Sequence, residues 1–230
     1  MQTEQPYWLE EAYSDSNLSN TDTGAVQRTL HNLAACYGLV RLFKVRNVID
    51  VGGSDGLLCR MLRDYDINCY VKDKYATPTY AQGFVEEDFK IPDLVISFEV
   101  LEHFSNPCED LDTLFSYNPK IILLSTVIYT NEREDWGYLS PESGQHVFFY
   151  SQPALEMIAK KYGYSPIFRG NYILFVKGAS RFQKIAAKLL LKDKNIRRIK
   201  SYLAYQPANG AYKDHLVQVE RSKQSQQLGS

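Results

Sequence analysis

The chain has 230 residues, of which 44% are hydrophobic and 23% charged, and its formal net charge is −1. This length suits one α/β domain with a sizeable core and is too short for two, and the composition is typical of a soluble globular protein. No segment reaches the run of about 18 apolar residues that crosses a bilayer, and the polar, acidic first residues do not resemble a signal peptide.

The charge is distributed unevenly along the chain. Residues 177–230 carry a net charge of +9, and residues 1–176 a net charge of −10. An acidic body with a basic tail indicates that the tail has a partner of its own. The four cysteines lack any paired spacing, so we expect reduced thiols in a cytoplasmic protein; they are Cys36, Cys59, Cys69 and Cys108.

The first 45 residues are expected to form an aromatic lead-in and one amphipathic helix. Tyr7, Trp8 and Tyr13 lie in the lead-in, which either packs over the core or closes over an active site as a lid. The helix is predicted from about Thr23 to Phe43, because apolar residues recur there at steps of three and four. In the expected domain organisation this cap precedes a core over 46–178 and a tail over 179–230.

Strands and helices alternate through the core. Strands are predicted at 48–51, 68–72, 82–85, 93–98 and 121–125, and helices at 57–63, 107–117 and 151–163. Two further strands, at 165–168 and 172–177, flank a Gly170-Asn171 turn and are predicted to form an antiparallel hairpin. This order predicts a Rossmann-like, doubly wound α/β sheet of seven strands, mostly parallel.

A glycine-rich turn follows the first core strand. Residues 50–56 read DVGGSDG and lead directly into an apolar helical run. A strand, a glycine turn and a helix in succession present backbone N–H groups to a ligand. The spacing is not the GxGxxG of dinucleotide-binding proteins, and the carboxylates of Asp50 and Asp55 favour a cationic ligand.

This turn resembles motif I, (D/E)xGxGxG, of class I S-adenosylmethionine-dependent methyltransferases, with Ser54 in the place of the middle glycine. Asp73 ends the second strand, where this family places the carboxylate that accepts the ribose hydroxyls. The resemblance implies S-adenosylmethionine as the cofactor and Asp88 with Phe89 at its adenine. The implied cofactor residues are Asp50, Gly52, Gly53, Ser54, Gly56, Asp73, Asp88, Phe89 and Glu99.

A second motif follows the fourth predicted strand. Residues 93–104, DLVISFEVLEHF, resemble methyltransferases with an EVLEH sequence, which include ubiquinone-type and sugar or polysaccharide-cluster O-methyltransferases. The resemblance implies that Glu99 lies near the methionyl end of the cofactor. It also implies that Glu102 and His103 face the methyl acceptor.

The loop over 126–150 is expected to bind the acceptor. Its WxYLxPxxGQHxxFY pattern is similar to methyltransferases encoded among polysaccharide enzymes, and it places Trp136, Tyr138 and Gln145 in the substrate pocket. Aromatic rings beside polar groups suit a sugar. We predict His146 as the general base, with His103 and Glu102 as further catalytic candidates. The alternative for His146 is a structural hydrogen bond within the loop.

The same side chains resemble a metal site. Glu99, Glu102 and His103 with the distant His146 are similar to the ExxEH…H magnesium site of small-RNA 3′-end 2′-O-methyltransferases, which implies Mg²⁺ held by these four residues. In other relatives with this sequence, the Glu and His line the cofactor pocket or pair with each other. RNA is less favoured as a substrate, because the basic residues form one stripe in the tail rather than a groove.

The tail is predicted to contain a basic amphipathic helix over 181–203, broken near Asp193, and a disordered end over 222–230. Its apolar stripe either packs on the domain or docks on an anionic membrane or an acidic protein. The predicted location is cytoplasmic, with peripheral binding at the inner membrane surface through this tail as the alternative.

Together these features predict a methyltransferase that uses S-adenosylmethionine. The expected reaction is O-methylation of a sugar or small-molecule hydroxyl in glycan or secondary-metabolite biosynthesis. The alternatives are a non-catalytic methyltransferase-like scaffold for glycosyltransferases and a metal-dependent RNA 2′-O-methyltransferase. Cofactor affinity distinguishes the scaffold from the enzymes.

Overall fold

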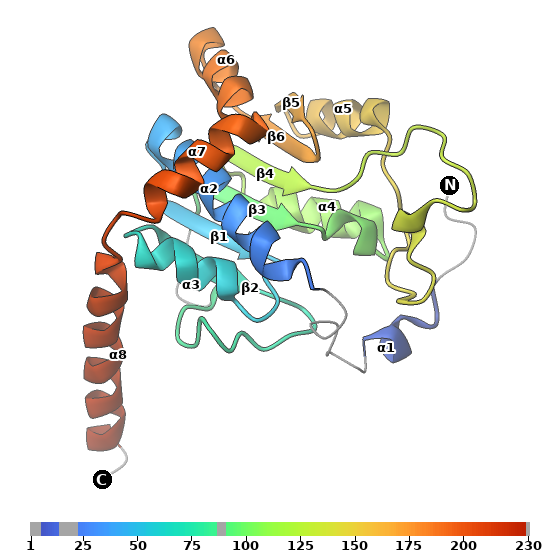
Figure 1. The fold of residues 1–230 in the computed structure, drawn as a ribbon. Coiled ribbons are helices and arrows are strands. Elements are labelled where there is room, and N and C mark those ends of the chain that lie inside the picture. Colours follow the sequence, from blue (N-terminus) through green and yellow to red (C-terminus); the bar gives the residue numbers. More distant parts are fainter. Residues whose placement is uncertain (1–5, 14–22, 87–90, 229–230) are drawn as a thin grey trace.

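The computed structural model describes residues 6–13, 23–86 and 91–228. Within them a single sheet has the strand order β2-β1-β3-β4-β6-β5 (Figure 1). Its first four strands are parallel, and β6 runs antiparallel to both of its neighbours. The strands are β1 (Asn47–Val51), β2 (Asn68–Lys72), β3 (Leu94–Phe98), β4 (Ile121–Ser125), β5 (Ser165–Arg169) and β6 (Tyr172–Val176).

The described part of the chain thus forms six strands, so the prediction of seven is wrong. The segment 82–85, expected as a strand, contributes only a β-bridge between Val71 and Val85. Gly83 adopts a φ of +79° there, which an extended strand does not tolerate, so the chain turns before a ladder can form.

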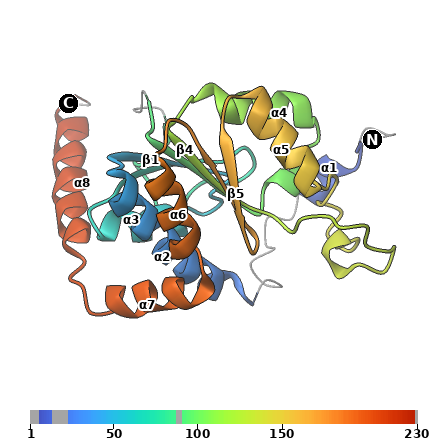
Figure 2. The ribbon, with the colours of Figure 1, turned by 90° about the horizontal axis from the view of Figure 1, so that it is seen from above.

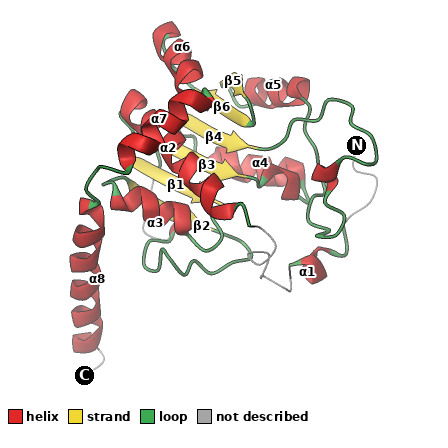
Figure 3. Cartoon of the chain, viewed as in Figure 1, coloured by secondary structure: helices red, strands yellow, loops and turns green. Residues whose placement is uncertain are grey.

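Helices cover both faces of the sheet, as Figures 2 and 3 show, and each face has its own apolar core. Alternate residues along each strand point to opposite faces. One core joins the sheet to α2 (Ala25–Phe43), α3 (Leu57–Asp64) and α7 (Asp193–Leu203), and the other joins it to α4 (Pro107–Ser116) and α5 (Gln152–Lys161). The doubly wound architecture follows from these two cores.

The basic tail forms three helices: α6 (Arg181–Leu190), α7 and α8 (Asn209–Leu228). The chain breaks between α6 and α7 at Leu191 and Lys192, next to Asp193. Residues 222–228 continue α8, so the expected disorder is wrong over this part of the tail. A helix that is anchored at one end extends readily, because each added residue gains one backbone hydrogen bond. Among the described residues, no helix combines the length and apolar character needed to cross a bilayer.

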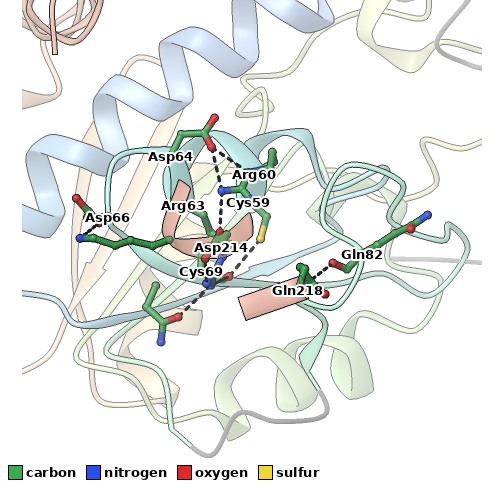
Figure 4. A network of polar contacts seen from close by, with 11 residues as sticks. Cys59, Arg60, Arg63, Asp64, Asp66, Cys69, Gln82, Asp214 and Gln218 are labelled. Carbon is green, nitrogen blue, oxygen red and sulfur yellow. Dashed lines mark hydrogen bonds and ion pairs between the residues drawn. The ribbon is translucent and has the colours of Figure 1, made fainter. Parts of the chain in front are cut away.

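The anchor of α8 is a cluster of ion pairs with α3. The carboxylate of Asp214 accepts hydrogen bonds from Arg60 and Arg63 at 2.7 Å (Figure 4). Farther along α8, the amide of Gln218 donates to the carbonyl oxygen of Gln82 at 3.1 Å. α8 therefore holds both α3 and the loop that follows β2.

Candidate active site

A cavity of about 1120 Å³ lies at the carboxyl ends of the parallel strands. The registers bring these ends together, since Val51 pairs with Lys72 and Phe98 with Ser125. The strand order reverses between β1 and β3, and in open α/β sheets ligands bind at such a point. The turn after β1, the loops after β2 and β3, α2 and the 137–146 segment all contribute to the cavity wall.

The glycine turn after β1 brings main chain to the surface of this cavity. Gly52 has a φ of +74°, and a Cβ at this position would lie 2.5 Å from a methyl carbon of Val100. Ser54 has a φ of +50°, which places it in the left-handed region that favours glycine. A side chain there costs roughly 1–2 kcal/mol. Ser54 therefore adopts the conformation expected of the glycine in motif I.

The carboxylate of Asp73 lies against the same turn. Its Oδ2 accepts the Ser54 main-chain N–H at 2.9 Å, and its Oδ1 accepts those of Tyr75 and Ala76, both at 2.8 Å. A carboxylate offers about four acceptor positions, so these amides leave room for about one more donor. Asp73 can accept a hydrogen bond from one ligand hydroxyl in this arrangement. It can accept a second only if one of the three main-chain N–H donors is displaced.

Asp50 lies beneath the turn and is 2% exposed. Its Oδ2 has no hydrogen-bond partner among the described residues. Burial, together with the charges of Asp73 and Asp55, raises the pKa of Asp50 to about 7. Because a buried carboxylate without a partner is unfavourable, a cationic ligand in the cavity would stabilise its ionised form.

Two carboxylates and a phenol form a network at the end of β3. The Ser125 hydroxyl donates to Glu99 at 2.6 Å, and the Tyr138 hydroxyl lies 2.9 Å from the other oxygen of Glu99 and also contacts Glu102. The single phenolic proton of Tyr138 can be donated to only one of the two carboxylates at a time. Burial, with the charge of Glu99, raises the pKa of Glu102 to about 7. Near neutral pH Glu102 therefore readily holds a proton of its own.

The two imidazoles of the site lie edge to face, with ring centres 4.9 Å apart. His146 Nδ1 is 2.5 Å from the carbonyl oxygen of Tyr138. A carbonyl only accepts hydrogen bonds, so Nδ1 carries the proton and the neutral ring has its lone pair on Nε2. His103 forms a hydrogen bond with the Tyr13 hydroxyl through Nδ1 and another with the main chain of Gln145. Burial and the neighbouring His146 lower the pKa of His103 to about 4, so it is neutral at physiological pH.

Residues 6–13, which include the short helix α1 (Leu9–Ala12), close one side of the site. The Tyr13 hydroxyl lies 2.8 Å from His103, and its ring stacks on Tyr75 with centres 4.0 Å apart. The Trp8 indole donates to the carbonyl oxygen of Gly144, and the Gln145 amide donates to that of Ala12, both at 2.8 Å. Tyr13 therefore links the loop that carries Asp73 to His103. The sequence predicts an aromatic lead-in here, but no motif identifies Tyr13 as a site residue.

Most of the predicted site residues meet in this cavity. Those in its wall are Asp50, Gly52, Gly53, Ser54, Asp73, Glu99, His103, Tyr138, Gln145 and His146. Gly56 precedes α3 behind the turn, and Glu102 is fully buried next to Tyr138. Trp136 lines a separate cavity of about 410 Å³ with Tyr129 and Phe149. Asp88 and Phe89 lie outside the described residues.

Three of the four predicted metal ligands come together. Potential ligand atoms of Glu102, His103 and His146 all lie within 4.8 Å of one another. Glu99 is not in this group, and its two oxygens are bonded to Ser125 and Tyr138. Two imidazoles and one carboxylate suit a transition-metal ion better than Mg²⁺, which prefers oxygen ligands. The donor set therefore does not favour the predicted Mg²⁺.

Several solved structures have a similar fold. One is TnmH, with 15% sequence identity over 74% of this chain and 60% of that chain and a TM-score of 0.51. Another is the mitomycin 7-O-methyltransferase MmcR, with 13% identity over 73% of this chain and 59% of that chain and a TM-score of 0.50. An O-methyltransferase family protein from Burkholderia thailandensis has 13% identity over 75% of this chain and 64% of that chain and a TM-score of 0.49. The chain spans about three fifths of the length of these proteins. No curated protein sequence matches it significantly.

The sequence of residues 23–167 matches the family model of a methyltransferase domain. The matched region is more than half of the chain and contains the glycine turn, Asp73, the EVLEH sequence and His146. It confirms the prediction of a methyltransferase with a Rossmann-like fold. The chain therefore belongs to the methyltransferase domain family, a family of S-adenosylmethionine-dependent enzymes.

Proposed function

We propose that the chain transfers a methyl group from S-adenosylmethionine to a hydroxyl oxygen of a sugar or another small molecule, with His146 as the general base. The observation that carries this proposal is the orientation of the His146 ring. Its Nδ1 is held by the Tyr138 carbonyl, which leaves Nε2 to accept a proton. His146 also lines the same cavity as the glycine turn and Asp73.

The cofactor residues follow from the cavity wall. We assign the turn over 52–56 to main-chain contacts, Asp73 to a ribose hydroxyl and Glu99 to the methionyl end. The unpartnered Oδ2 of Asp50 beneath the turn supports a ligand with positive charge. Asp88 and Phe89 remain our prediction for the adenine. When bound, the cofactor supplies a methyl group on a positively charged sulfur.

The reaction needs alignment more than it needs strong acid or base chemistry. One oxygen–carbon bond forms as one carbon–sulfur bond breaks, and the hydroxyl proton must leave. Orientation of the acceptor supplies about 7–11 kcal/mol of such a barrier, and proton removal adds about 10²–10⁴-fold in rate. We assign orientation of the acceptor to Tyr138, Glu102 and Gln145, and proton removal to Nε2 of His146.

The test measures formation of S-adenosylhomocysteine with a panel of activated sugars and phenols. We expect His146→Gln to lower kcat by about 10²–10⁴-fold. The affinity for S-adenosylhomocysteine should be unchanged, because His146 is assigned to the acceptor. His215→Gln, a substitution of an exposed histidine on α8, is the matched control. A His146→Gln enzyme with full turnover would assign His146 to a structural role in the loop.

The cluster of Glu102, His103 and His146 favours a second candidate, a metal-assisted methyl transfer to an RNA 2′-hydroxyl. This reaction predicts that a chelator abolishes activity and that Mn²⁺ or Zn²⁺ restores it. Activity on a small hydroxyl compound that is indifferent to the chelator would exclude it. A scaffold without catalysis, the remaining alternative, predicts no turnover on any acceptor and no need for tight cofactor binding.

A further inference from the structure

Helix α6 presents an apolar stripe to solvent. Phe182, Ile185 and Leu189 are 75%, 52% and 46% exposed. With 3.6 residues per turn, these three side chains lie within about 60° of one another around the helix. The opposite side packs on the domain, where Leu190 contacts Gly38 of α2 so closely that a Cβ on Gly38 would lie 2.7 Å from it. The exposed stripe is therefore not needed for the packing of α6 on the domain.

The periodic pattern of the tail divides into two parts with different surroundings. In α7, Ile196 and Leu203 are buried and Ile199 packs against the same core, next to α2. Packing on the domain thus explains the apolar residues of α7. It does not explain the exposed residues of α6, which would lower solubility without a compensating contact.

Basic side chains adjoin the stripe. Residues 181–200 contain eight Lys or Arg and one acidic residue, Asp193, which pairs with Arg197. Arg181 and Lys188 are exposed on α6, and Lys194 and Arg198 are exposed on α7. The body over 1–176 has the opposite net charge, −10. An anionic surface would therefore attract the α6–α7 region and repel the body.

We propose that this α6 stripe, Phe182 with Ile185 and Leu189, docks on an anionic lipid bilayer. The apolar side chains enter the boundary between headgroups and acyl chains, and the neighbouring Lys and Arg side chains contact the headgroups. Basic and apolar residues side by side on an exposed helix are the pattern of interfacial helices. A specific protein interface buries about 800 Å² on each partner, whereas a bilayer needs only a few apolar side chains and charge.

The position of α6 leaves the cavity accessible during docking. Strand β6 ends at Val176, which pairs with Ile121 at the start of β4. α6 begins five residues later, so it leaves the sheet at the amino ends of the parallel strands and projects from the domain (Figure 1). The cavity lies at the carboxyl ends. Docking through α6 therefore leaves the cavity free to exchange soluble ligands.

Vesicle flotation with the full chain tests the proposal. We expect binding to vesicles of phosphatidylglycerol and phosphatidylcholine, and at least tenfold weaker binding to phosphatidylcholine alone. Binding should weaken as salt is raised, since the Debye length falls to about 8 Å at physiological ionic strength. The triple variant Phe182→Ser, Ile185→Ser, Leu189→Ser should bind anionic vesicles at least tenfold more weakly, as should Arg181→Glu with Lys188→Glu.

Two substitutions on α5 are the matched controls. Met157 is 73% exposed and Lys160 is also exposed, so Met157→Ser and Lys160→Glu change the same surface properties elsewhere. They should leave binding unchanged, and thermal unfolding should show that every variant is folded. Wild-type protein that ignores anionic vesicles, or a folded triple variant that binds like wild type, would overturn the proposal. So would a wild-type dimer that the triple variant converts to a monomer, since the stripe would then bind a second copy.

Discussion

The main-chain N–H of Ser54 donates a hydrogen bond of 2.9 Å to Oδ2 of Asp73. This contact joins the glycine turn after β1 to the end of β2. It fixes the carboxylate in the wall of the cavity that the turn also lines. The two features of the methyltransferase pattern that lie 19 residues apart in sequence thus form one binding surface.

Asp73→Ala should weaken binding of S-adenosylmethionine at least tenfold. The substitution removes an acceptor for the ligand, and it also releases the main-chain amides of Ser54, Tyr75 and Ala76. Each charge-assisted hydrogen bond contributes about 1.5–3 kcal/mol. Isothermal titration calorimetry measures the change, with Asp112→Ala on the surface of α4 as the control. Equal affinity of Asp73→Ala and wild type would refute the ribose assignment.

Asp50→Asn should stabilise the ligand-free protein at alkaline pH. In the folded state the pKa of Asp50 is about 7, whereas in the unfolded chain its pKa is close to the ordinary value of 3.8. Asp50 therefore lowers the free energy of unfolding more and more as the pH rises from 3.8 to about 7, and the full loss applies above pH 7. The variant should gain up to the order of 4 kcal/mol in unfolding free energy at high pH and nothing in strong acid.

Denaturant unfolding of both proteins over this pH range checks the prediction. The same variant should bind S-adenosylmethionine more weakly, because it cannot supply a charge beneath the turn. A stability difference that does not change with pH would contradict the raised pKa of Asp50.

Tyr13→Ala should loosen residues 6–13 and speed release of the cofactor. The substitution removes both the hydrogen bond to His103 and the stacking on Tyr75. Hydrogen exchange should show faster exchange over 6–13, and stopped-flow measurements should show a higher dissociation rate. Tyr7→Ala, at a residue 82% exposed in the same segment, is the control. Unchanged dissociation would show that this segment is not a lid.

Asp214→Asn should destabilise the fold through α8. Burial acts to raise the pKa of Asp214, but hydrogen bonds and charges from Arg63 and Arg60 outweigh it and lower the pKa. Ionised Asp214 therefore stabilises the folded protein at pH values above its pKa in the unfolded chain. This stabilisation is lost as the pH falls through its lower pKa in the folded protein. Loss of one partner of such a buried pair costs about 3 kcal/mol near neutral pH. Thermal unfolding of the variant measures it, and an unchanged midpoint would contradict the role of α8 as a clamp.

Local sequence patterns were sufficient to locate the parallel strands and the glycine turn. Strands such as Ile121–Ser125 are continuous apolar runs, which identify buried strands with bounds correct to about one residue. The turn could be found because its glycines and Asp50 lie within seven consecutive residues, 50–56. The segment 82–85 led to a wrong count of strands, because Gly83 bends the chain just before the apolar residues Phe84 and Val85.

Contacts between distant segments could not be predicted in this way. Tyr13 and His103 are separated by 90 residues, and nothing in either local sequence indicates their hydrogen bond. The same holds for α8, whose attachment depends on Asp214 meeting Arg60 and Arg63 more than 150 residues away. The loop around His146 could be predicted as part of the site, and His146 does line the cavity, but the orientation of its ring depends on a carbonyl placed by the folded loop.

A calorimetric titration of the wild-type protein with S-adenosylmethionine tests the proposed activity most directly, because it needs no knowledge of the acceptor. We predict saturable one-to-one binding, competition by S-adenosylhomocysteine and no binding of NADH, whose pyrophosphate the carboxylates around the turn would repel. Absence of saturable binding of S-adenosylmethionine, or binding of NADH in its place, would contradict the proposal that this cavity holds the methyl donor.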